Sequence, residues 1–124
     1  MVHPDADLSR LCGRSILIAE TNPLIALDLA ATIAARGMRP VMYSDLAMAG
    51  EAVPFPELAA ALVDMDLPFD EHAALVGQLQ SNGTPTILTT AWAGDSVADR
   101  FPGLTVFEKP VHFPALAQWF AGIG

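Results

Sequence analysis

Short apolar runs alternate with stretches of helical character along this chain, and this alternation constrains its fold more than any other feature. Five runs have the length and composition of buried β-strands: residues 15–19, 40–43, 59–63, 86–90 and 104–108. Strands that alternate with helices build a parallel sheet with helices on both faces. The sequence therefore predicts the α/β class, as a (βα)5 doubly wound sheet of five parallel strands in the order 2-1-3-4-5.

The expected helices lie between and after these strands. Asn22-Pro23 predicts a helix start, because the asparagine side chain caps free amides and proline at the first helical position gives up no hydrogen bond. This helix should run to Arg36, with Gly37 as its stop. The other helices are expected at 45–53, 70–80, 94–100 and 114–121, and the fourth of the five has room for only two turns.

The chain is predicted to form one domain. Its 124 residues, 52% of them hydrophobic, are enough to bury a single core of useful size. Residues 1–13 are a polar lead-in that we expect to be loosely ordered, and residues 14–124 should form the folded domain.

Charge and cysteine content exclude several classes of function. The formal net charge is −8 and the six basic residues are scattered, which argues against a nucleic-acid partner. Cys12 is the only cysteine, so an internal disulfide and a cysteine-based metal site are excluded. The first ten residues lack the apolar core of a signal peptide, and no apolar run approaches the ~20 residues of a membrane span. We expect a cytoplasmic protein without a membrane partner.

Polar residues whose side chains could bind a ligand or react stand at the ends of four predicted strands. Glu20 follows the first strand, Asp64 the third and Lys109 the fifth, while Thr90 ends the fourth. Parallel sheets bind ligands outside the carboxyl ends of their strands, so these residues should converge. Because the first and third strands are neighbours, the two carboxylates would lie close together and require a neutralising partner such as Mg²⁺. Such a site can hold a divalent cation and a phosphoryl group.

Each of these residues also has a purely structural interpretation. An aspartate at a strand end can cap a nearby helix or turn, and a lone lysine or threonine there is commonly structural or solvated. Four chemically compatible residues at four strand ends favour the functional interpretation over this one.

Four segments together resemble the response-regulator receiver domain, the CheY-like module of two-component signal transduction. They are Ile16–Leu29, Leu62–Pro68, Pro85–Ala91 and Phe107–Pro110. The resemblance covers residues 14–122 and implies the flavodoxin/CheY-like fold. The compressed fourth helix before the last strand is similar to a receiver subgroup often seen in alphaproteobacteria.

The resemblance implies that Asp64 accepts a phosphoryl group from a histidine kinase or a phosphotransfer protein in a phosphorelay. Thr90 and Lys109 would bind the phosphoryl oxygens, and the Lys109-Pro110 peptide bond would be cis. The chemistry is in-line displacement on phosphorus, driven by positioning and charge neutralisation. A receiver promotes its own phosphorylation and dephosphorylation, so the chain would not be a dedicated enzyme.

The expected cofactor is Mg²⁺, held by Glu20, Asp64 and the main-chain carbonyl of Asp66. Receivers usually carry an acidic pair after the first strand, and the second position here is Thr21. A hydroxyl adds no negative charge facing the metal, so we expect Mg²⁺ to bind more weakly than in such receivers.

Three other positions are expected to modulate signalling. Val106 stands where many receivers have an aromatic residue that moves inward on activation, so the usual coupling through Thr90 is not expected. Phe107 should face the other side of the sheet by strand alternation. Asp66 and Trp92 flank the approach of an attacking water, and Trp92 is either a shield for the aspartyl phosphate or an aromatic lid on the sheet edge.

The leading functional hypothesis is a stand-alone receiver that signals by protein–protein interaction with a downstream target. The face built from the fourth helix, fifth strand and fifth helix is the expected contact, and it could also support a homodimer. Its apolar residues either supply contact area or belong to the core: Phe113, Leu116, Trp119 and Phe120.

Two alternatives remain. A degenerate receiver would act as a phosphorylation-independent interaction module, and Thr21 and Val106 favour it. An enzyme is the other, because Asp64-Met-Asp66 also resembles the Asp-x-Asp motif of haloacid-dehalogenase-type phosphatases. That motif usually lies on the first core strand and needs a later acidic pair, whereas nothing after Lys109 supplies an acid.

Overall fold

A parallel β-sheet forms the centre of the computed structural model, which describes residues 8–91 and 100–123. Its strands run in the order β2-β1-β3-β4-β5, and every pair of neighbours is parallel. The predicted α/β class and strand order are confirmed. The strands are β1 (Ser15–Ala19), β2 (Arg39–Met42), β3 (Leu58–Asp64), β4 (Thr86–Thr90) and β5 (Thr105–Glu108).

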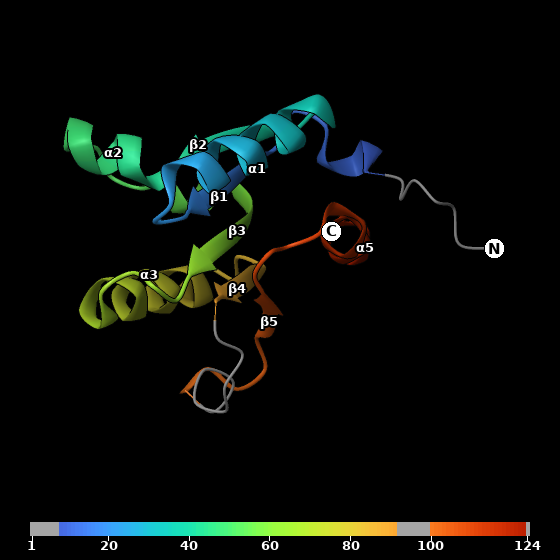
Figure 1. Ribbon diagram of the computed structural model, residues 1–124. Helices are drawn as coiled ribbons and strands as arrows, with labels where there is room; N and C mark the ends of the chain where they lie inside the picture. The colour runs from blue at the N-terminus through green and yellow to red at the C-terminus, as the bar shows by residue number, and fades with distance from the viewer. Residues whose placement is uncertain (1–7, 92–99, 124) are drawn as a thin grey trace.

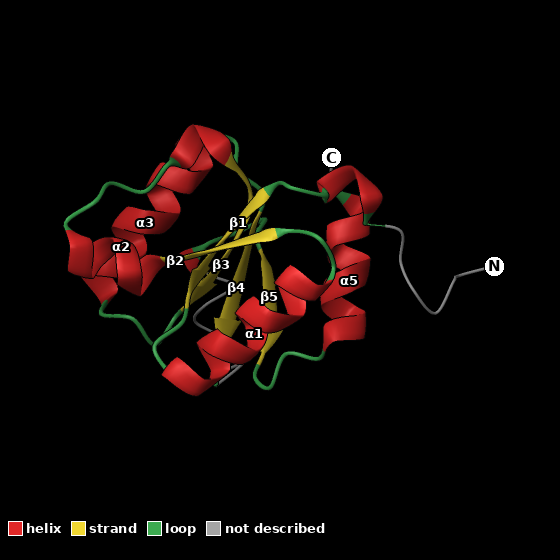
Figure 2. Ribbon diagram, turned by 90° about the horizontal axis from the view of Figure 1, so that it is seen from above, coloured by secondary structure: helices red, strands yellow, loops and turns green. Residues whose placement is uncertain are grey.

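Helices cover both faces of the sheet (Figures 1 and 2). One face carries α1 (Pro23–Ala35) and α5 (Phe113–Gly122), and the other carries α2 (Tyr43–Ala49) and α3 (Phe69–Ser81). The fourth helix, expected at 94–100, lies outside the described residues except for Arg100. None of the helices in the described part of the chain is long and apolar enough to cross a lipid bilayer.

The second strand and helix differ from the prediction in their boundaries. Pairing with β1 ends at Met42, and Tyr43 begins α2 instead of closing the strand. The tyrosine has high strand propensity, but its ring packs on the α2/α3 side of the core. The helix ends at Ala49 rather than 53, because Gly50 adopts a left-handed φ of 69° that stops it.

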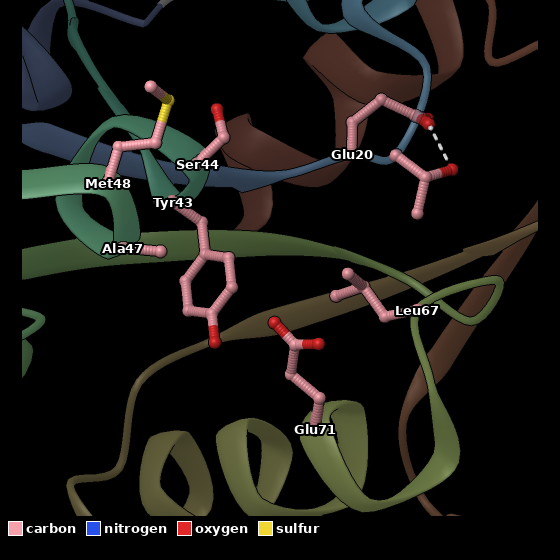
Figure 3. Close-up of a pocket in the computed structure, with 8 residues that line it drawn as sticks. Glu20, Tyr43, Ser44, Ala47, Met48, Leu67 and Glu71 are labelled. Carbon is pink, nitrogen blue, oxygen red and sulfur yellow. Dashed lines mark hydrogen bonds between the residues drawn. The ribbon is translucent and has the colours of Figure 1, made fainter.

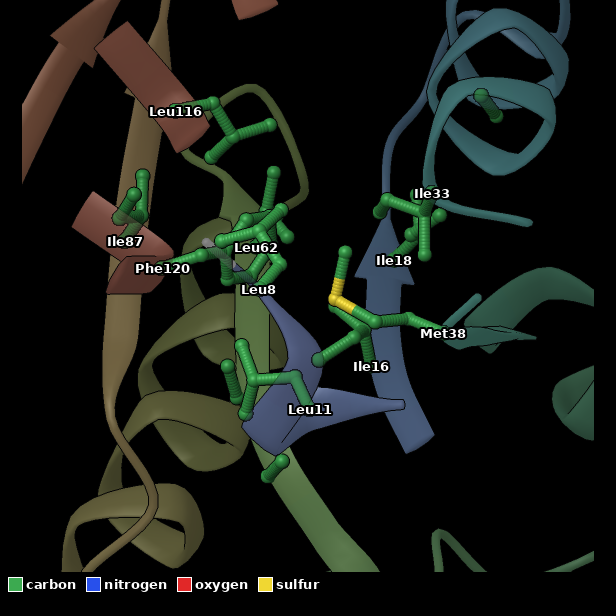
Figure 4. Close-up of a cluster of buried hydrophobic side chains, with 13 residues drawn as sticks. Leu8, Leu11, Ile16, Ile18, Ile33, Met38, Leu62, Ile87, Leu116 and Phe120 are labelled. Carbon is green, nitrogen blue, oxygen red and sulfur yellow. The ribbon is translucent and has the colours of Figure 1, made fainter. Parts of the chain in front are cut away.

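Alternating side chains of the strands build two cores, one under each helical layer. The cluster beneath α1 and α5 contains Ile16, Ile18, Leu62, Ile87, Leu116 and Phe120 (Figure 4). The cluster beneath α2 and α3 contains Leu17, Val63, Leu75, Leu79 and Leu88. Every residue of β3 is buried, because this strand lies at the centre of the sheet. The rigid central strand therefore fixes the position of Asp64 at its end.

The structure differs from the expectation of a loosely ordered lead-in through residue 13. Leu8 and Leu11 are buried in the α1/α5 core, and a short 3₁₀ helix (Ser9–Leu11) joins them. The Arg10 side chain donates to the Ala121 carbonyl at 2.8 Å, and the Gly13 amide donates to Gly37 at 2.7 Å. From residue 8 onward this segment packs as part of the domain.

Truncating Leu11 should test whether this segment contributes to stability. We expect Leu11→Ala to lower the free energy of unfolding by about 2–3 kcal/mol, because it removes a buried leucine side chain and leaves a cavity. Leu24 is 77% exposed, so the matched Leu24→Ala should change stability by less than about 0.5 kcal/mol. Urea unfolding followed by circular dichroism measures both, and equal losses would contradict the observed packing.

Candidate functional site

Charged side chains from three strand ends meet at the carboxyl edge of the sheet. The Lys109 ammonium, after β5, lies 2.9 Å from Asp64 Oδ2 and 3.0 Å from Glu20 Oε1. It also lies 3.5 Å from Asp66 Oδ2 in the loop after β3. The structure thus brings together four residues that the sequence proposed for the site. One ammonium group partly neutralises three carboxylates.

Backbone hydrogen bonds beyond the strands hold the loops of this site in place. The Lys109 amide donates to the Thr90 carbonyl at 2.7 Å, which extends the β4–β5 pairing by one residue. The Met65 amide donates to Thr89 at 2.8 Å, and the Leu67 amide donates to the Asp64 carbonyl at 3.2 Å. The backbone that carries the Asp64 and Lys109 side chains is therefore held in place by hydrogen bonds to the sheet.

Asp64 is a fully buried carboxylate whose oxygens have hydrogen-bond donors. Its Oδ2 accepts from the Thr21 amide at 3.0 Å and from the Thr21 hydroxyl at 2.6 Å, and its Oδ1 accepts from the Asp66 amide at 2.9 Å. Burial by itself raises the pKa of Asp64, but these donors and Lys109 outweigh it and hold the pKa well below its ordinary value. Asp64 is therefore ionised at neutral pH, and an ionised carboxylate can act as a nucleophile.

Lys109 stays charged for a related reason. Burial lowers the pKa of its ammonium, but hydrogen bonds and charge attraction from Asp64 and Glu20 raise it above the ordinary value. Lys109 is also the only lysine in the chain. A permanent, partly buried cation therefore stands beside the Asp64 carboxylate, where it can also pair with an incoming anionic group.

Glu20 links the site to the start of α1. Its Oε2 accepts from the Asn22 amide at 2.9 Å, and Asn22 Oδ1 in turn accepts from the Leu24 amide at 2.9 Å. The predicted asparagine cap is therefore present. The Thr21 hydroxyl lies 3.3 Å from Glu20 Oε2, a longer contact than the one it makes with Asp64. The turn between β1 and α1 positions both Glu20 and Thr21.

The remaining predicted positions lie around this cluster. Thr90 is buried at the end of β4, between the strands that carry Asp64 and Lys109. Val106 packs against the α2/α3 core and Phe107 against the α1/α5 core, as strand alternation predicts. The Lys109-Pro110 peptide bond is cis. Trp92 lies outside the described residues.

A pocket of about 370 Å³ opens beside Glu20 and Thr21, between α2 and the start of α3 (Figure 3). The Tyr43 hydroxyl faces the Glu71 carboxylate across it (Figure 3). Burial, and then the hydrogen bond and charge of Glu71, raise the pKa of Tyr43. The sequence did not predict this pocket, because Tyr43 was expected at the end of a strand and Glu71 in the helix at 70–80.

His72 is a further residue near the site whose buried position the sequence did not predict. It is buried on the inner face of α3, its Nδ1 lies 2.8 Å from the Leu67 carbonyl, and its ring contacts Phe69 and Phe101 edge-on. In the described part of the chain, Nε2 has no hydrogen-bond partner. The only available signal was its spacing with Leu75, Val76 and Leu79 on one helix face. Its bond to Leu67 steadies the loop after Asp64.

The donor set at this site fits Mg²⁺ incompletely. Mg²⁺ requires near-octahedral oxygen ligation, and Glu20 and Asp64 supply two buried carboxylates. The Lys109 ammonium already contacts both of them, and Thr21 supplies no carboxylate. Across residues 8–91 and 100–123, no three acidic, histidine or cysteine side chains form a group that could hold a metal ion.

Comparison with known proteins places this fold among receiver domains. No family model matches the sequence, and no curated protein aligns with it significantly. A response regulator receiver protein from Burkholderia phymatum is similar in structure, with a TM-score of 0.68 and 14% identity over 90% of this chain and 97% of that one. The solution structure of SdrG from Sphingomonas melonis Fr1 is also similar, with a TM-score of 0.65 and 27% identity over 88% of this chain and 94% of that one.

A third similar structure contains a complex. It is the co-crystal structure of the histidine phosphotransfer protein Ypd1 of Saccharomyces cerevisiae and the receiver domain of its downstream response regulator Ssk1. Its TM-score is 0.66, with 17% identity over 92% of this chain and 90% of that one. The chain therefore has the CheY-like fold of response-regulator receiver domains, and the resemblance found in the sequence is confirmed.

Proposed function

We propose that this chain is a receiver of two-component signalling that accepts a phosphoryl group on Asp64. The observation that carries the proposal is the buried, ionised Asp64 carboxylate at the end of the central strand, 2.9 Å from the Lys109 ammonium. The phosphoryl donor is a histidine kinase or a phosphotransfer protein. The similarity to the structure solved with a histidine phosphotransfer protein supports a partner of this class.

The transfer is an in-line displacement on phosphorus. A carboxylate oxygen of Asp64 attacks the phosphorus of a phosphohistidine, the phosphorus–nitrogen bond breaks, and the imidazole leaves with the electron pair. Lys109 pairs with the oxygens of the transferred group, and the Thr90 hydroxyl donates to them. Weakly bound Mg²⁺, held by Glu20, Asp64 and the Asp66 carbonyl, would supply further neutralisation of charge.

The proposed output is a change in protein–protein contacts, by a cytoplasmic module that is not a dedicated enzyme. Residues of α5 that the sequence offered as a contact face contribute less than expected, because Leu116 and Phe120 are buried in the core. Phe113 and Trp119 are partly buried against the same core. A downstream target, or a second copy of the chain, would therefore contact mainly the other residues of β5 and α5, together with the fourth helix that the sequence predicts.

A degenerate receiver that interacts without phosphorylation is the second candidate function. The contacts of Thr21 favour it, because the amide and hydroxyl of this residue already occupy Asp64 Oδ2. A phosphatase of the Asp-x-Asp type is not favoured, since residues 110–124 contain no aspartate or glutamate to supply its later acids.

Intact-mass spectrometry after treatment with acetyl phosphate tests the proposal. With and without Mg²⁺, the wild type and the control Asp28→Asn should gain the mass of one phosphoryl group, and Asp64→Asn should gain none. Asp28 is a matched control because it is an exposed aspartate on α1. An unchanged adduct on Asp64→Asn would place the phosphorylation elsewhere. Failure to label the wild type, with acetyl phosphate and with a cognate kinase, would favour the degenerate receiver.

A further inference from the structure

The two oxygens of the Asp64 carboxylate have different surroundings. Oδ2 lies within hydrogen-bond distance of three donors: the Thr21 amide at 3.0 Å, the Thr21 hydroxyl at 2.6 Å and the Lys109 ammonium at 2.9 Å. Oδ1 accepts from the Asp66 amide at 2.9 Å. Among the described residues, the contact with a cation falls on Oδ2. In the described part of the chain, the contacts that offset the negative charge of the carboxylate therefore gather at Oδ2, and Oδ1 has fewer of them.

Thr21 changes the charge of this cluster as well as its hydrogen bonding. Glu20, Asp64 and Asp66 place three carboxylates around one ammonium. An acid at position 21 would add a fourth, which a divalent cation would have to neutralise before an anionic phosphoryl donor could approach. A threonine instead donates a hydrogen bond to the carboxylate. The carboxylates of this site therefore need less neutralisation by a bound cation, because Thr21 and Lys109 already supply part of it.

We propose that Thr21 and Lys109 take over at Asp64 Oδ2 the neutralising role of a divalent cation, so that phosphoryl transfer to Asp64 depends only weakly on Mg²⁺. This inference rests on the proposed receiver function. Thr21 acts as a positioning residue: its hydroxyl and amide hold Oδ2, and Oδ1 is the oxygen assigned to the attack on phosphorus. Lys109 supplies the positive charge.

Phosphoryl transfer from acetyl phosphate to Asp64 can be written without a metal ion. Asp64 Oδ1 forms a bond to phosphorus, the bond between phosphorus and the acetate oxygen breaks, and acetate leaves with the electron pair. During the transfer Oδ2 becomes the carbonyl oxygen of the acyl phosphate and keeps its hydrogen bonds with Thr21. The Lys109 ammonium then pairs with the phosphoryl oxygens.

Three substitutions at Thr21 separate the hydroxyl from the shape and charge of the side chain. Thr21→Val removes the hydroxyl and keeps the shape, Thr21→Ser keeps the hydroxyl, and Thr21→Asp introduces the acid. Thr32→Val is the matched control, because the Thr32 hydroxyl bonds the Asp28 carbonyl within α1 and is remote from the site. Circular dichroism of each variant shows that it is folded.

The rate of adduct formation from acetyl phosphate is then measured in EDTA and across a Mg²⁺ titration. We expect the wild type, Thr21→Ser and Thr32→Val to label in EDTA at rates within about threefold of those at saturating Mg²⁺. Thr21→Val should label about tenfold more slowly in EDTA, since it loses the hydrogen bond that positions the carboxylate and offsets part of the charge that repels the anionic donor. Thr21→Asp should label only when Mg²⁺ is present.

Mg²⁺ affinity gives a readout that does not depend on phosphorylation. Calorimetric titration should show Thr21→Asp binding Mg²⁺ about tenfold more tightly than the wild type, and Thr21→Val binding it no more tightly. If the wild type is labelled only when Mg²⁺ is present, and its labelling rate rises with Mg²⁺ concentration as steeply as that of Thr21→Asp, the inference is overturned. The proposed function would remain intact. Absence of an adduct on every variant at every Mg²⁺ concentration would overturn the proposed function, and the inference with it.

Discussion

Replacing Lys109 by methionine is expected to lower the free energy of unfolding by about 2–4 kcal/mol at neutral pH. The substitution keeps most of the side-chain length and removes the ammonium that contacts Glu20 and Asp64 at 3.0 and 2.9 Å. The side chains of these acids are only 4% and 0% exposed, so water cannot replace the lost cation. Two buried carboxylates would be left facing each other without compensation. Urea unfolding at pH 7 measures the loss.

A double variant shows whether the loss arises from the stranded charges. Asp64→Asn in the Lys109→Met background removes one of the two carboxylates and should restore about half of the lost stability. Arg39→Met is the matched control, because it removes an exposed cation at the start of β2 and should cost less than about 0.5 kcal/mol. If Lys109→Met costs no more than Arg39→Met, the ammonium does not stabilise this carboxylate cluster.

The sheet was predictable because its strands are short, apolar and clearly bounded. Ile16–Ala19 and Ala59–Val63 read as buried strands in the sequence, and polar residues mark the point where each ends. Parallel connectivity then dictates that the strand ends meet at one edge, whatever the details of the loops. The convergence of Glu20, Asp64 and Lys109 follows from that topology, which explains why the composition of the site could be predicted.

The N-terminal packing was not predictable from local pattern. Leu8 and Leu11 stand in a polar stretch too short to show a period, and the residues they pack with, such as Met38 and Phe120, are distant in sequence. Their burial depends on the completed sheet and on α5. Tertiary contacts of this kind leave no signal in a window of neighbouring residues.

The role of Thr21 was only half visible in the sequence. Its identity shows that an acid is absent, and from this a weaker Mg²⁺ site follows. Its identity does not show where the hydroxyl points, and the amides of Thr21 and Asp66 that donate to Asp64 exist at every residue other than proline. The position of these donors is a property of the two loops, so the hydrogen-bonded state of Asp64 had to come from the structure.

The fifth helix raises a related question, because its apolar residues suit either a core or a docking surface. In the structure Phe120 is 1% exposed, and it belongs with Leu116 to the core cluster between α5 and the sheet (Figure 4). The Arg36 guanidinium lies 4.5 Å from the ring centre of Phe113, which joins α5 to the end of α1. The helix therefore presents its aromatic residues largely to the domain itself, and this arrangement has a measurable consequence.

Phe120→Ala should cost about 3–4 kcal/mol of unfolding free energy, because it opens a large cavity between α5 and the sheet. That is a substantial part of the 5–15 kcal/mol or so that stabilises a typical domain. Phe69 is 58% exposed, so the matched Phe69→Ala should cost less than about 1 kcal/mol. Urea unfolding of both variants provides the comparison. A small loss for Phe120→Ala would mean that this face of α5 is available to a partner, and the apolar residues of the helix would return as candidates for the signalling surface.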